Sequence, residues 1–421
     1  MIPQLARWLD WIVEEHHKHR PVGLDRVELL ASRLNILNPS QKSVVVAGTN
    51  GKGSTVRYLE QILRDFGYTV GTTTSPHLYK YNERVRICNR SVSDEDILQA
   101  FVSIEEVREG IPLTYFEWTT LAALEIFNRY EIERAILEVG LGGRLDACNV
   151  VNRTVNVITN IGMDHTQVLG SDREAIGTEK AGILRAGIPL VYGDEAPVST
   201  VIRRAEAIDC RVYRIKEEFC HDVDSNGAWQ CWATSKNERV SFTFAAKPSL
   251  PHSALLAVQT ALILENSANN QLEKVPLHSV ELPGRLEFRH FRGRDWLLDV
   301  AHNFEAAKFV KQQLDLNFGE REFSVLLGCL EDKDAGHIVD ALGVMENRVV
   351  VTSTHGHRGQ SAEKLAKKLY PRPVRVEPDL EVALDYLVSS TNSHDLILVA
   401  GSFELVGRLR KMNTIGIGRR G

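Results

Sequence analysis

The sequence lacks the features that mark a secreted, membrane or nucleic-acid-binding protein. Its six cysteines are scattered along 421 residues without a C-x-x-C pair, which argues for reduced thiols rather than a zinc site or a disulfide framework. No segment is long and apolar enough to span a bilayer, and the N-terminus has no basic region followed by an unbroken apolar run. A net charge of -5 gives no support for nucleic acid or an anionic membrane as the main partner. We therefore expect a cytoplasmic protein that binds neither.

The composition that is present is that of a globular protein with more than one domain. Hydrophobic residues make up 43% of the chain and charged residues 25%, as in soluble globular proteins. The chain is too long for one ordinary core, so two domains are expected. Two prolines and a glycine interrupt the segment 272–285 (LEKVPLHSVELPGR), where we place the boundary. The expected domains are residues 1–280 and 281–421.

The stretch 43–55 (SVVVAGTNGKGST) has the pattern of a buried strand, a glycine-rich loop and the start of a helix. Three consecutive valines are typical of a strand buried on both faces of a parallel sheet. Apolar residues then recur at helical intervals up to Phe66, and Gly67 stands where a helix C-cap glycine belongs. Such a loop presents backbone N–H groups and a helix N-terminus to a phosphate. Lys52 adds a positive charge, and Ser54 or Thr55 offers a hydroxyl to Mg²⁺.

The spacing of this loop differs from the usual Walker pattern. Only two residues separate Gly48 from Gly51, and Lys52 is followed by a glycine before the first hydroxyl. Taken alone, a glycine-rich turn in an α/β sheet explains the stretch as well as a phosphate site does.

Polar residues occur at the carboxyl ends of three other predicted strands, where open α/β sheets bind ligands. Ser75 is either a magnesium ligand or part of a Ser-Pro turn. Glu138 lies at the end of an apolar strand, where an acid is costly unless it is paired or metal-bound, so it is the best single magnesium candidate. Asp164 and His165 are either ligands or a structural contact. The three strands are expected at 68–74, 135–139 and 155–159.

The remaining pattern alternates helices with strands, which predicts an α/β fold with a second, Rossmann-like sheet beyond the boundary. Alternating residues between 211 and 245, around Asn226-Gly227, predict a small antiparallel hairpin. His16, His17 and His19 are interpreted as a solvated helix end. Further helices are expected at 5–13, 27–37, 93–106, 114–130, 172–184, 251–264, 306–314, 362–369 and 380–388, and further strands at 81–87, up to Tyr192, and at 296–300, 325–327, 349–352 and 396–399.

A set of motifs occurs along the chain in one order: GTNGKGS, TSPHL, ERVR, TYFE, LEVGLGGRLDA, DHT, EKAGI, LPGR, DVAHN, DKD and GSF. In these motifs, and over nearly its whole length, the sequence resembles the dihydrofolate synthase/folylpolyglutamate synthase family of the Mur ligase superfamily. The resemblance implies an N-terminal P-loop ATPase domain of Mur ligase type and a C-terminal Rossmann-like α/β domain. It also implies an ATP-dependent ligase that joins L-glutamate to a carboxylate through an acyl phosphate. The acceptors that it implies are dihydropteroate and (tetrahydro)folates, and the state that it suggests is a monomer.

The same resemblance assigns roles to residues at matched positions. It implies two Mg²⁺ ions held by Ser75, Glu138, His165 and Lys180, with Lys180 carbamoylated on its amine. His302 is expected near the incoming glutamate. The ATP-binding residues are Gly48, Thr49, Asn50, Gly51, Lys52, Gly53 and Ser54 around the phosphates, with Lys52 on the β- and γ-phosphates, and Ser253, Arg285 and Asp299 around the adenosine. The pterin-side residues are Thr114, Tyr115, Phe116, Glu117, Arg144 and Asp146.

Four positions depart from the family pattern. Pro21 stands where an aspartate used in dihydropteroate binding is usual, and Ser253 stands where an asparagine contacts adenine. DHTD reads DHTQ at Gln167, and DVAHNP reads DVAHNF at Phe304. The departures concern the pterin and nucleotide sides and leave the phosphate-loop and magnesium positions intact.

Two other functions fit the same motifs. A Mur-type ligase for a different carboxylate is one alternative, and a changed pterin loop would favour it. A nucleotide-binding regulatory paralogue without turnover is the other. The joint presence of Lys52, Glu138, His165 and Lys180 argues against the paralogue, because nucleotide binding alone does not require all four.

Overall fold

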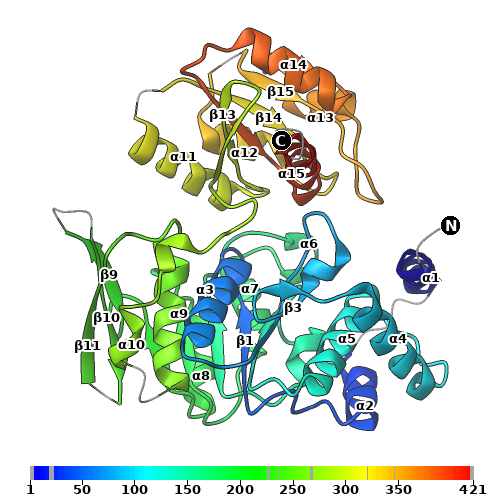
Figure 1. The fold of residues 1–421 in the computed structure, drawn as a ribbon, viewed down its shortest axis with the longest axis vertical. Coiled ribbons are helices and arrows are strands. Elements are labelled where there is room, and N and C mark those ends of the chain that lie inside the picture. The colour runs from blue at the N-terminus through cyan, green and yellow to red at the C-terminus, as the bar shows by residue number, and fades with distance from the viewer. Residues whose placement is uncertain are drawn as a thin grey trace. The chain divides into compact units, whose positions relative to one another are not determined.

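The chain divides into two compact units. The computed structural model describes residues 4–18, 23–224, 228–236, 238–265, 269–319, 321–345 and 347–417. One unit consists of Met1–His77 with Tyr81–Val280, and the other of Leu78–Lys80 with Glu281–Gly421. Figure 1 shows that each unit is built around its own sheet.

The first unit contains an eight-stranded sheet with the order β4-β3-β2-β5-β1-β6-β7-β8. Neighbouring strands from β2 to β8 are parallel, and β3 and β4 add an antiparallel edge. The central strands are buried on both faces, as their runs of valine, isoleucine and leucine predict. The strands are β1 (Lys42–Ala47), β2 (Val70–Thr73), β3 (Val85–Ile87), β4 (Arg90–Ser91), β5 (Arg134–Glu138), β6 (Val155–Ile158), β7 (Leu190–Tyr192) and β8 (Val212–Arg214).

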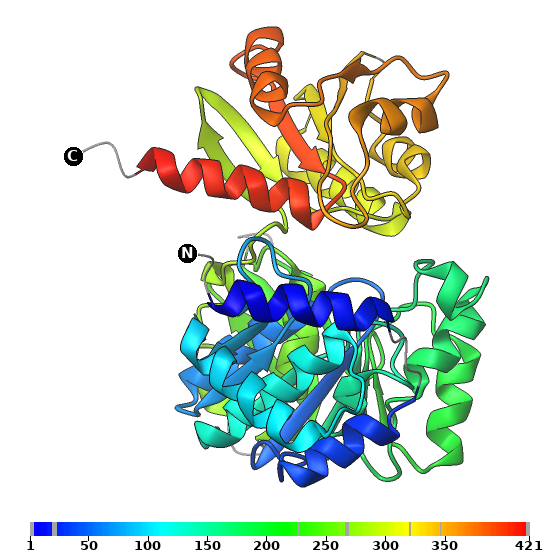
Figure 2. The same ribbon diagram turned by 90° about the vertical axis from the view of Figure 1, so that its right-hand side faces the viewer.

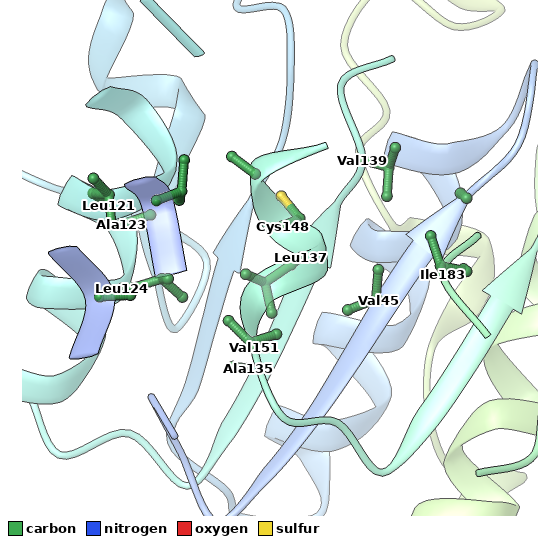
Figure 3. Packing of buried hydrophobic residues seen from close by; sticks show 14 of the residues in the cluster. Val45, Leu121, Ala123, Leu124, Ala135, Leu137, Val139, Cys148, Val151 and Ile183 are labelled. Atoms are coloured by element: carbon green, nitrogen blue, oxygen red, sulfur yellow. The ribbon is translucent and has the colours of Figure 1, made fainter. Parts of the chain in front are cut away.

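Helices cover both faces of this sheet. On one face, α3 and α9 pack against each other and against the central strands. On the other face, α1 and α2 pack outside α4 and α5 (Figure 2). Figure 3 shows part of the hydrophobic core on this second face. Helix α5 contributes Leu121 and Leu124 to it, and the strands contribute Val45 and Leu137. The helices are α1 (Gln4–Lys18), α2 (Asp25–Arg33), α3 (Lys52–Asp65), α4 (Asp94–Arg108), α5 (Tyr115–Arg129), α6 (Thr166–Leu169), α7 (Arg173–Ala181), α8 (Ser199–Ala207) and α9 (Pro251–Leu264).

A three-stranded antiparallel sheet, β11-β10-β9, follows β8. It contains the predicted antiparallel hairpin as β9 and β10, which flank residues 226–227, and β11 adds a third strand along the other edge of β10. The fully buried Trp229 packs on Phe244 with 5.1 Å between ring centroids and anchors the pairing. Asn226 and Gly227 lie outside the described residues. The elements are β9 (Cys220–Val223), β10 (Trp229–Ser235), β11 (Glu238–Phe244), α10 (Asn269–Leu272) and the short 3₁₀ turn η3 (Leu277–Ser279).

The second unit contains a six-stranded sheet with the order β12-β13-β17-β14-β15-β16. Only its edge strand β12 is antiparallel to its neighbour. Helices α11, α12 and α13 pack on one face, and α14 and α15 on the other. The elements are β12 (Glu287–Phe291), β13 (Arg294–Leu298), α11 (Phe304–Phe318), β14 (Phe323–Leu327), α12 (Ala335–Leu342), β15 (Val349–Val351), α13 (Ala362–Leu369), β16 (Arg375–Val376), α14 (Leu380–Ser390), β17 (Leu396–Ala400) and α15 (Phe403–Ile417).

The short segment Leu78–Lys80 belongs to the second unit, although its sequence neighbours belong to the first. Leu78 packs into the core beneath α14 and α15. At Gly407 of α15 the backbones come so close that an added Cβ would lie 2.0 Å from the carbonyl oxygen of Leu78. Glycine at position 407 therefore permits the contact between this segment and α15.

Several element boundaries differ from those predicted. Residues 81–84 form a 3₁₀ turn, η1 (Tyr81–Arg84), instead of a strand, because Tyr81 and Arg84 both point inward at the i, i+3 spacing of that helix. Helix α3 begins at Lys52, within the predicted stretch 43–55, since Gly51 takes the N-cap position with φ 82°. Helix α2 ends before Asn35, whose φ of 57° breaks the helix.

Other predictions concern parts that the structure describes only partly. Pro21 and His19 lie outside the described residues, as do the side chains of His16 and His17. All six cysteines are free. In the described ranges, no helix is both long and apolar enough to cross a bilayer.

Candidate active site

The predicted phosphate loop connects the end of β1 to the start of α3. Gly48 has φ 146°, and a Cβ at this position would lie 1.8 Å from Oγ1 of Thr159, so no side chain fits there. Gly51 caps α3 without any side-chain hydrogen bond to the first turn. The first turn of α3 is therefore capped by backbone alone, the geometry in which a helix N-terminus receives a phosphate.

The segment after the neighbouring strand β6 holds this loop in place. The hydroxyl of Thr159 donates to the Asn50 carbonyl at 2.6 Å, and the Asn50 amide donates to Oδ1 of Asn160 at 2.9 Å. The Thr49 amide donates to the Asn160 carbonyl at 3.0 Å, and its hydroxyl accepts from the Gly162 amide at 2.9 Å. The motifs did not identify Thr159 and Asn160, although polar residues at the end of a predicted strand were a signal for them.

Two lysines converge on the loop from different helices. The ammonium of Lys180, on α7, donates to the Gly48 carbonyl at 2.8 Å, and that of Lys52 donates to the same carbonyl at 3.1 Å. Lys180 is buried, and burial followed by the charge of Lys52 lowers its pKa to about 7. The carboxylates of Asp164 and Asp146 partly oppose this shift. The pair concentrates positive charge at the loop.

The predicted magnesium ligands Glu138 and Ser75 lie together beside the start of α3. Glu138 is the last residue of β5, is 5% exposed and accepts the Ser75 amide at 3.0 Å through Oε2. The same oxygen lies 3.2 Å from the place that a Cβ on Gly53 would occupy. A buried carboxylate and a hydroxyl are the hard oxygen donors that Mg²⁺ prefers, so these two residues fit the group that the sequence suggests.

His165 and Lys180 are the other two predicted metal ligands. His165 caps α6 with φ 51°, and its amide donates to Oδ1 of Asp164 at 2.8 Å. Asp164 in turn acts on Lys180 as a nearby negative charge. No group of three or more His, Cys, Asp or Glu side chains suited to a metal occurs in the part of the chain that the structure describes. Of the predicted ligands, only Glu138 and His165 are of these residue types, and Ser75 contributes a hydroxyl. A carbamate on Lys180 would supply the third strong ligand.

The predicted pterin-side residues lie at the start of α5 and in the loop after β5. Thr114 and Glu117 form a capping box, and Glu117 also pairs with Arg26 of α2, so both of its oxygens are engaged within the protein. Phe116 packs so closely on Gly140 that a Cβ there would lie 2.8 Å from the ring. Tyr115 lies against Arg84.

The loop 140–148 is held by Asp146. This carboxylate accepts from the amides of Gly140, Leu141 and Cys148 at 2.9, 3.1 and 2.9 Å. Burial raises the pKa of Asp146 to about 6, and the three amides oppose the rise. Arg144, at the loop surface, pairs with Glu179 of α7 at 2.9 Å. Asp146 therefore shapes the loop, whereas Arg144 has a half-exposed side chain.

The predicted adenosine and glutamate residues are divided between the two units. In the first unit, Ser253 of α9 has its hydroxyl 3.1 Å from where a Cβ on Gly51 would lie. In the second unit, Arg285 lies 3.9 Å from Asp299 and 5.1 Å from the ring of Phe403. His302 lies 6.1 Å from the same ring. Both Arg285 and His302 thus lie near the ring of Phe403, a residue that the prediction did not include.

Asp299 is buried, whereas two of the positions that depart from the family pattern are exposed. Burial raises the pKa of Asp299, whereas Arg285 and the amides of Leu286 and Ala301 oppose the rise. Phe304, one of the departures from the family pattern, begins α11 and packs its half-exposed ring edge-on against His337. Gln167, another departure, lies exposed on α6.

Comparison with known proteins gives the family of the chain. Residues 46–270 match the Mur ligase middle domain, and residues 284–403 match the glutamate ligase domain of Mur ligases. The chain is 36% identical to the dihydrofolate synthase/folylpolyglutamate synthase of Haemophilus influenzae over 96% of each protein. The chain belongs to the dihydrofolate synthase/folylpolyglutamate synthase family. It is an ATP-dependent acid–amino acid ligase that adds glutamate, as that family does.

Two solved structures resemble the whole chain. A bifunctional folylpolyglutamate synthase/dihydrofolate synthase of Yersinia pestis, complexed with AMPPNP and Mn ion, has a TM-score of 0.89 at 35% identity and covers 98% of each chain. The Escherichia coli protein FolC, in complex with DHPP and ADP, has a TM-score of 0.88 at 34% identity and covers 100% of this chain and 99% of its own. The α/β fold with a middle ATPase domain and a C-terminal glutamate ligase domain is therefore that of the family.

Proposed function

We propose that residues 1–280 bind ATP and the acceptor carboxylate, and that residues 281–421 form the ligase domain that brings L-glutamate. The observation that carries this proposal is the convergence of Lys52 and Lys180 on the Gly48 carbonyl, beside the carboxylate of Glu138. The cation of Lys52 and an uncapped helix N-terminus bind the charge of a triphosphate. Lys52 then offsets the charge that develops on the transferring γ-phosphoryl group when the acceptor carboxylate attacks it.

The metal assignment extends this proposal. Ser75, Glu138, His165 and a carbamoylated Lys180 would hold two Mg²⁺ ions, which neutralise phosphate charge when bound. The relatives supply support, since the Yersinia pestis enzyme is complexed with AMPPNP and Mn ion. Burial of Lys180 supplies more, because an amine whose pKa is lowered to about 7 is partly neutral, and the neutral amine is the form that adds CO₂.

We propose dihydropteroate and (tetrahydro)folates as acceptors. The complex of the Escherichia coli protein with DHPP supports a pterin ligand. The start of α5 and the loop 140–148 are the parts that would receive it, with Tyr115 and Phe116 as aromatic surfaces and with Thr114, Glu117, Arg144 and Asp146 around them. Ser253, Arg285 and Asp299 would bind adenosine, and His302 would lie near glutamate. We also propose a cytoplasmic monomer.

The test of this function is phosphate release from ATP with Mg²⁺ and L-glutamate, with dihydropteroate, tetrahydrofolate or no acceptor in parallel. Release with both acceptors and none without them is expected. Release with tetrahydrofolate alone would restrict the enzyme to chain extension and assign the loss to the changed loop at Pro21. If neither acceptor causes phosphate release in a protein that still binds ATP, the result would favour a different acceptor carboxylate or the regulatory paralogue without turnover.

Glu138→Ala tests the metal assignment. Loss of a carboxylate ligand should raise the Mg²⁺ concentration for half-maximal activity by about tenfold or more, because ligand charge sets the affinity of a hard-cation site. Glu133→Ala is the matched control, since Glu133 is a partly exposed acid directly before the same strand and its carboxylate bonds to Thr69 instead of the site. A magnesium titration of each variant makes the comparison. Unchanged magnesium dependence in Glu138→Ala would remove Glu138 from the site.

A further inference from the structure

Arg84 is a buried cation that the mechanism has not used. It ends η1 and is only 8% exposed. Burying a charge costs several kcal/mol unless an opposite charge or hydrogen bonds compensate for it. Among the described residues no carboxylate forms an ion pair with Arg84, and its side chain makes one hydrogen bond, from Nε to Nδ1 of His77 at 2.8 Å. Its two terminal amino groups therefore have no protein partner in the described part of the chain.

The surroundings of Arg84 hold its side chain in one orientation. The guanidinium carbon lies 5.7 Å from the ring centroid of Tyr81 and 5.3 Å from that of Tyr115. The two rings are nearly perpendicular to each other at 5.9 Å, and the Tyr81 hydroxyl is tied to Oγ1 of Thr119 at 2.9 Å. His77 fixes the plane of the group from the Nε side. Cation–π contacts of this kind stabilise an arginine by less than the cost of burying its charge.

The unpaired edge of Arg84 remains within reach of a small molecule. Neither terminal amino group of Arg84 belongs to the fully buried side-chain atoms that lack a hydrogen-bond partner. Both groups are therefore accessible from outside the protein. A planar guanidinium edge binds a carboxylate through two parallel hydrogen bonds, and it is far better suited to this task than an ammonium group. The chemistry of the position therefore favours a carboxylate ligand.

Arg84 also lies in the correct part of the first unit. Its carbonyl accepts the Thr74 amide at 3.0 Å, and the next residue, Ser75, donates its amide to Glu138. Tyr115, which covers the guanidinium, begins α5 beside the loop after β5. The arginine thus lies at the carboxyl ends of β2 and β5, next to the residues proposed for metal and acceptor binding.

We propose that the guanidinium of Arg84 binds a carboxylate of the acceptor substrate, with Tyr81, Tyr115 and His77 holding it in position. The inference rests on the proposed function, because that function supplies the acceptor. Two carboxylates have this chemistry: the reacting one, present in every acceptor, and the non-reacting α-carboxylate, present only in acceptors that already carry glutamate. Dihydropteroate has the first alone and tetrahydrofolate has both, so the two acceptors distinguish them.

The experiment compares Arg84→Gln and Arg84→Lys with the wild-type full-length chain in the phosphate-release assay. Arg84→Gln should raise the KM for the acceptor by about tenfold to a hundredfold, because two charge-assisted hydrogen bonds are lost, and it should leave the KM for ATP within about twofold. Arg86→Gln is the matched control: Arg86 lies two residues along, but its guanidinium is already engaged by Glu60 and Asn89. It should leave the acceptor KM unchanged.

The pattern of loss decides the inference. A raised KM for both acceptors supports binding of the reacting carboxylate, and a raised KM for tetrahydrofolate alone supports binding of the α-carboxylate. An unchanged acceptor KM, or equal changes for acceptor and ATP, would overturn the assignment. If Arg84→Gln melts far below wild type, Arg84→Lys gives the same reading, since it keeps the charge and loses the two-nitrogen edge. A wild-type protein that is inactive with both acceptors would refute the proposed function itself, and the Arg84 assignment with it.

An equilibrium measurement separates ligand binding from a purely structural role. Wild-type protein should bind dihydropteroate more tightly than its uncharged carboxamide, by about tenfold or more. Arg84→Gln should bind the acid and the amide alike, because the group that distinguishes them is gone. Equal preference for the acid in both proteins would rule out binding of the reacting carboxylate, whatever the stability of the variant. The same comparison between tetrahydrofolate and its α-carboxamide then tests the α-carboxylate, and equal preference there as well would contradict the proposal.

Discussion

At the scale of single residues, buried charge marks the candidate site. Lys180 and Glu138 are both about 5% exposed, and each is stabilised by backbone groups of the loops around the sheet edge: Lys180 by the Gly48 carbonyl and Glu138 by the Ser75 amide. Charges buried at this cost are expected to act on a ligand.

Lys180→Ala should lower turnover by about a hundredfold or more while leaving the fold intact, since removal of one group that stabilises transition-state charge costs that much. The melting temperature should be equal or higher, because a buried cation is removed. Lys216→Ala, at an exposed lysine paired with Glu195, is the control and should keep full activity. Full activity in Lys180→Ala would show that the carbamate assignment is wrong. Steady-state kinetics and thermal unfolding make both comparisons.

His252 should make stability depend on pH. Burial lowers its pKa below the usual 6.5, and hydrogen bonds with the backbone of Thr159 and Gly193 oppose the shift. Below about pH 6.5 the unfolded chain therefore binds a proton that the folded chain does not, so the free energy of unfolding falls as the pH decreases and is level above. His252→Gln should reduce this acid loss, whereas His278→Gln, at an exposed histidine, should not. Parallel pH profiles of wild type and His252→Gln in thermal unfolding would contradict the prediction.

Some of the site could be predicted from single residues and some could not. Glu138 was identifiable because an acid in an apolar strand is costly, whatever the fold. Thr159, Asn160 and Arg84 gave no comparable signal, because their roles depend on which segments become neighbours. Chain order does not give strand order: β6 follows β5 in sequence but pairs with β1, and that pairing brings Thr159 to the loop.

At the scale of elements, apolar periodicity predicted the buried helices well. Helices α9 and α13 begin and end where they were expected, because their apolar residues face a core. Strand β12 was missed, since none of its residues is fully buried and its alternation is weak. Helix α8 was also missed, and only its Val201 and Ala205 are buried. The periodicity of apolar residues in a sequence reflects which side chains are buried. An element with few buried side chains is therefore hard to predict from it.

Gly48→Ala should destroy the phosphate loop. The added Cβ would meet Thr159 at 1.8 Å, so the loop must move and the KM for ATP should rise by about a hundredfold. Gly67→Ala is the matched control, because Gly67 also has positive φ, at 91°, but has no atom within 4 Å of its Cβ position. It should cost about 1 kcal/mol of stability and leave the KM for ATP unchanged. ATP titrations that gave the same KM for both variants would refute the role of the loop.

Gly407→Ala should destabilise the second unit. Its Cβ would lie 2.0 Å from the Leu78 carbonyl, and overpacking of this kind costs about 1–3 kcal/mol. Gly336→Ala is the control within another helix of the unit, where the nearest atom is 3.4 Å away, and it should leave stability equal or slightly higher. Denaturant unfolding followed by tryptophan fluorescence would report both changes. Equal midpoints for the two variants would contradict the close contact of Leu78 with α15.

At the scale of the whole molecule, the sequence predicted two α/β parts but not how the chain passes between them. Composition and the proline-rich segment near residue 280 are local features, so they indicate where one part ends. The segment Leu78–Lys80 carries no such signal, because three residues have no periodicity of their own. Its place in the second unit depends on contacts with Gly284, Val406 and Gly407, which lie more than two hundred positions away in the sequence.

This arrangement has a consequence for any attempt to divide the gene. A single break at residue 280 would leave Leu78, which packs into the core of the second unit, on the N-terminal fragment. The C-terminal fragment would then have an unfilled slot beneath α15, and the N-terminal fragment would carry the segment that fills it. The two halves are thus natural candidates for a split reporter, in which co-expressed fragments recognise each other through Leu78 and restore ligase activity only when both are present.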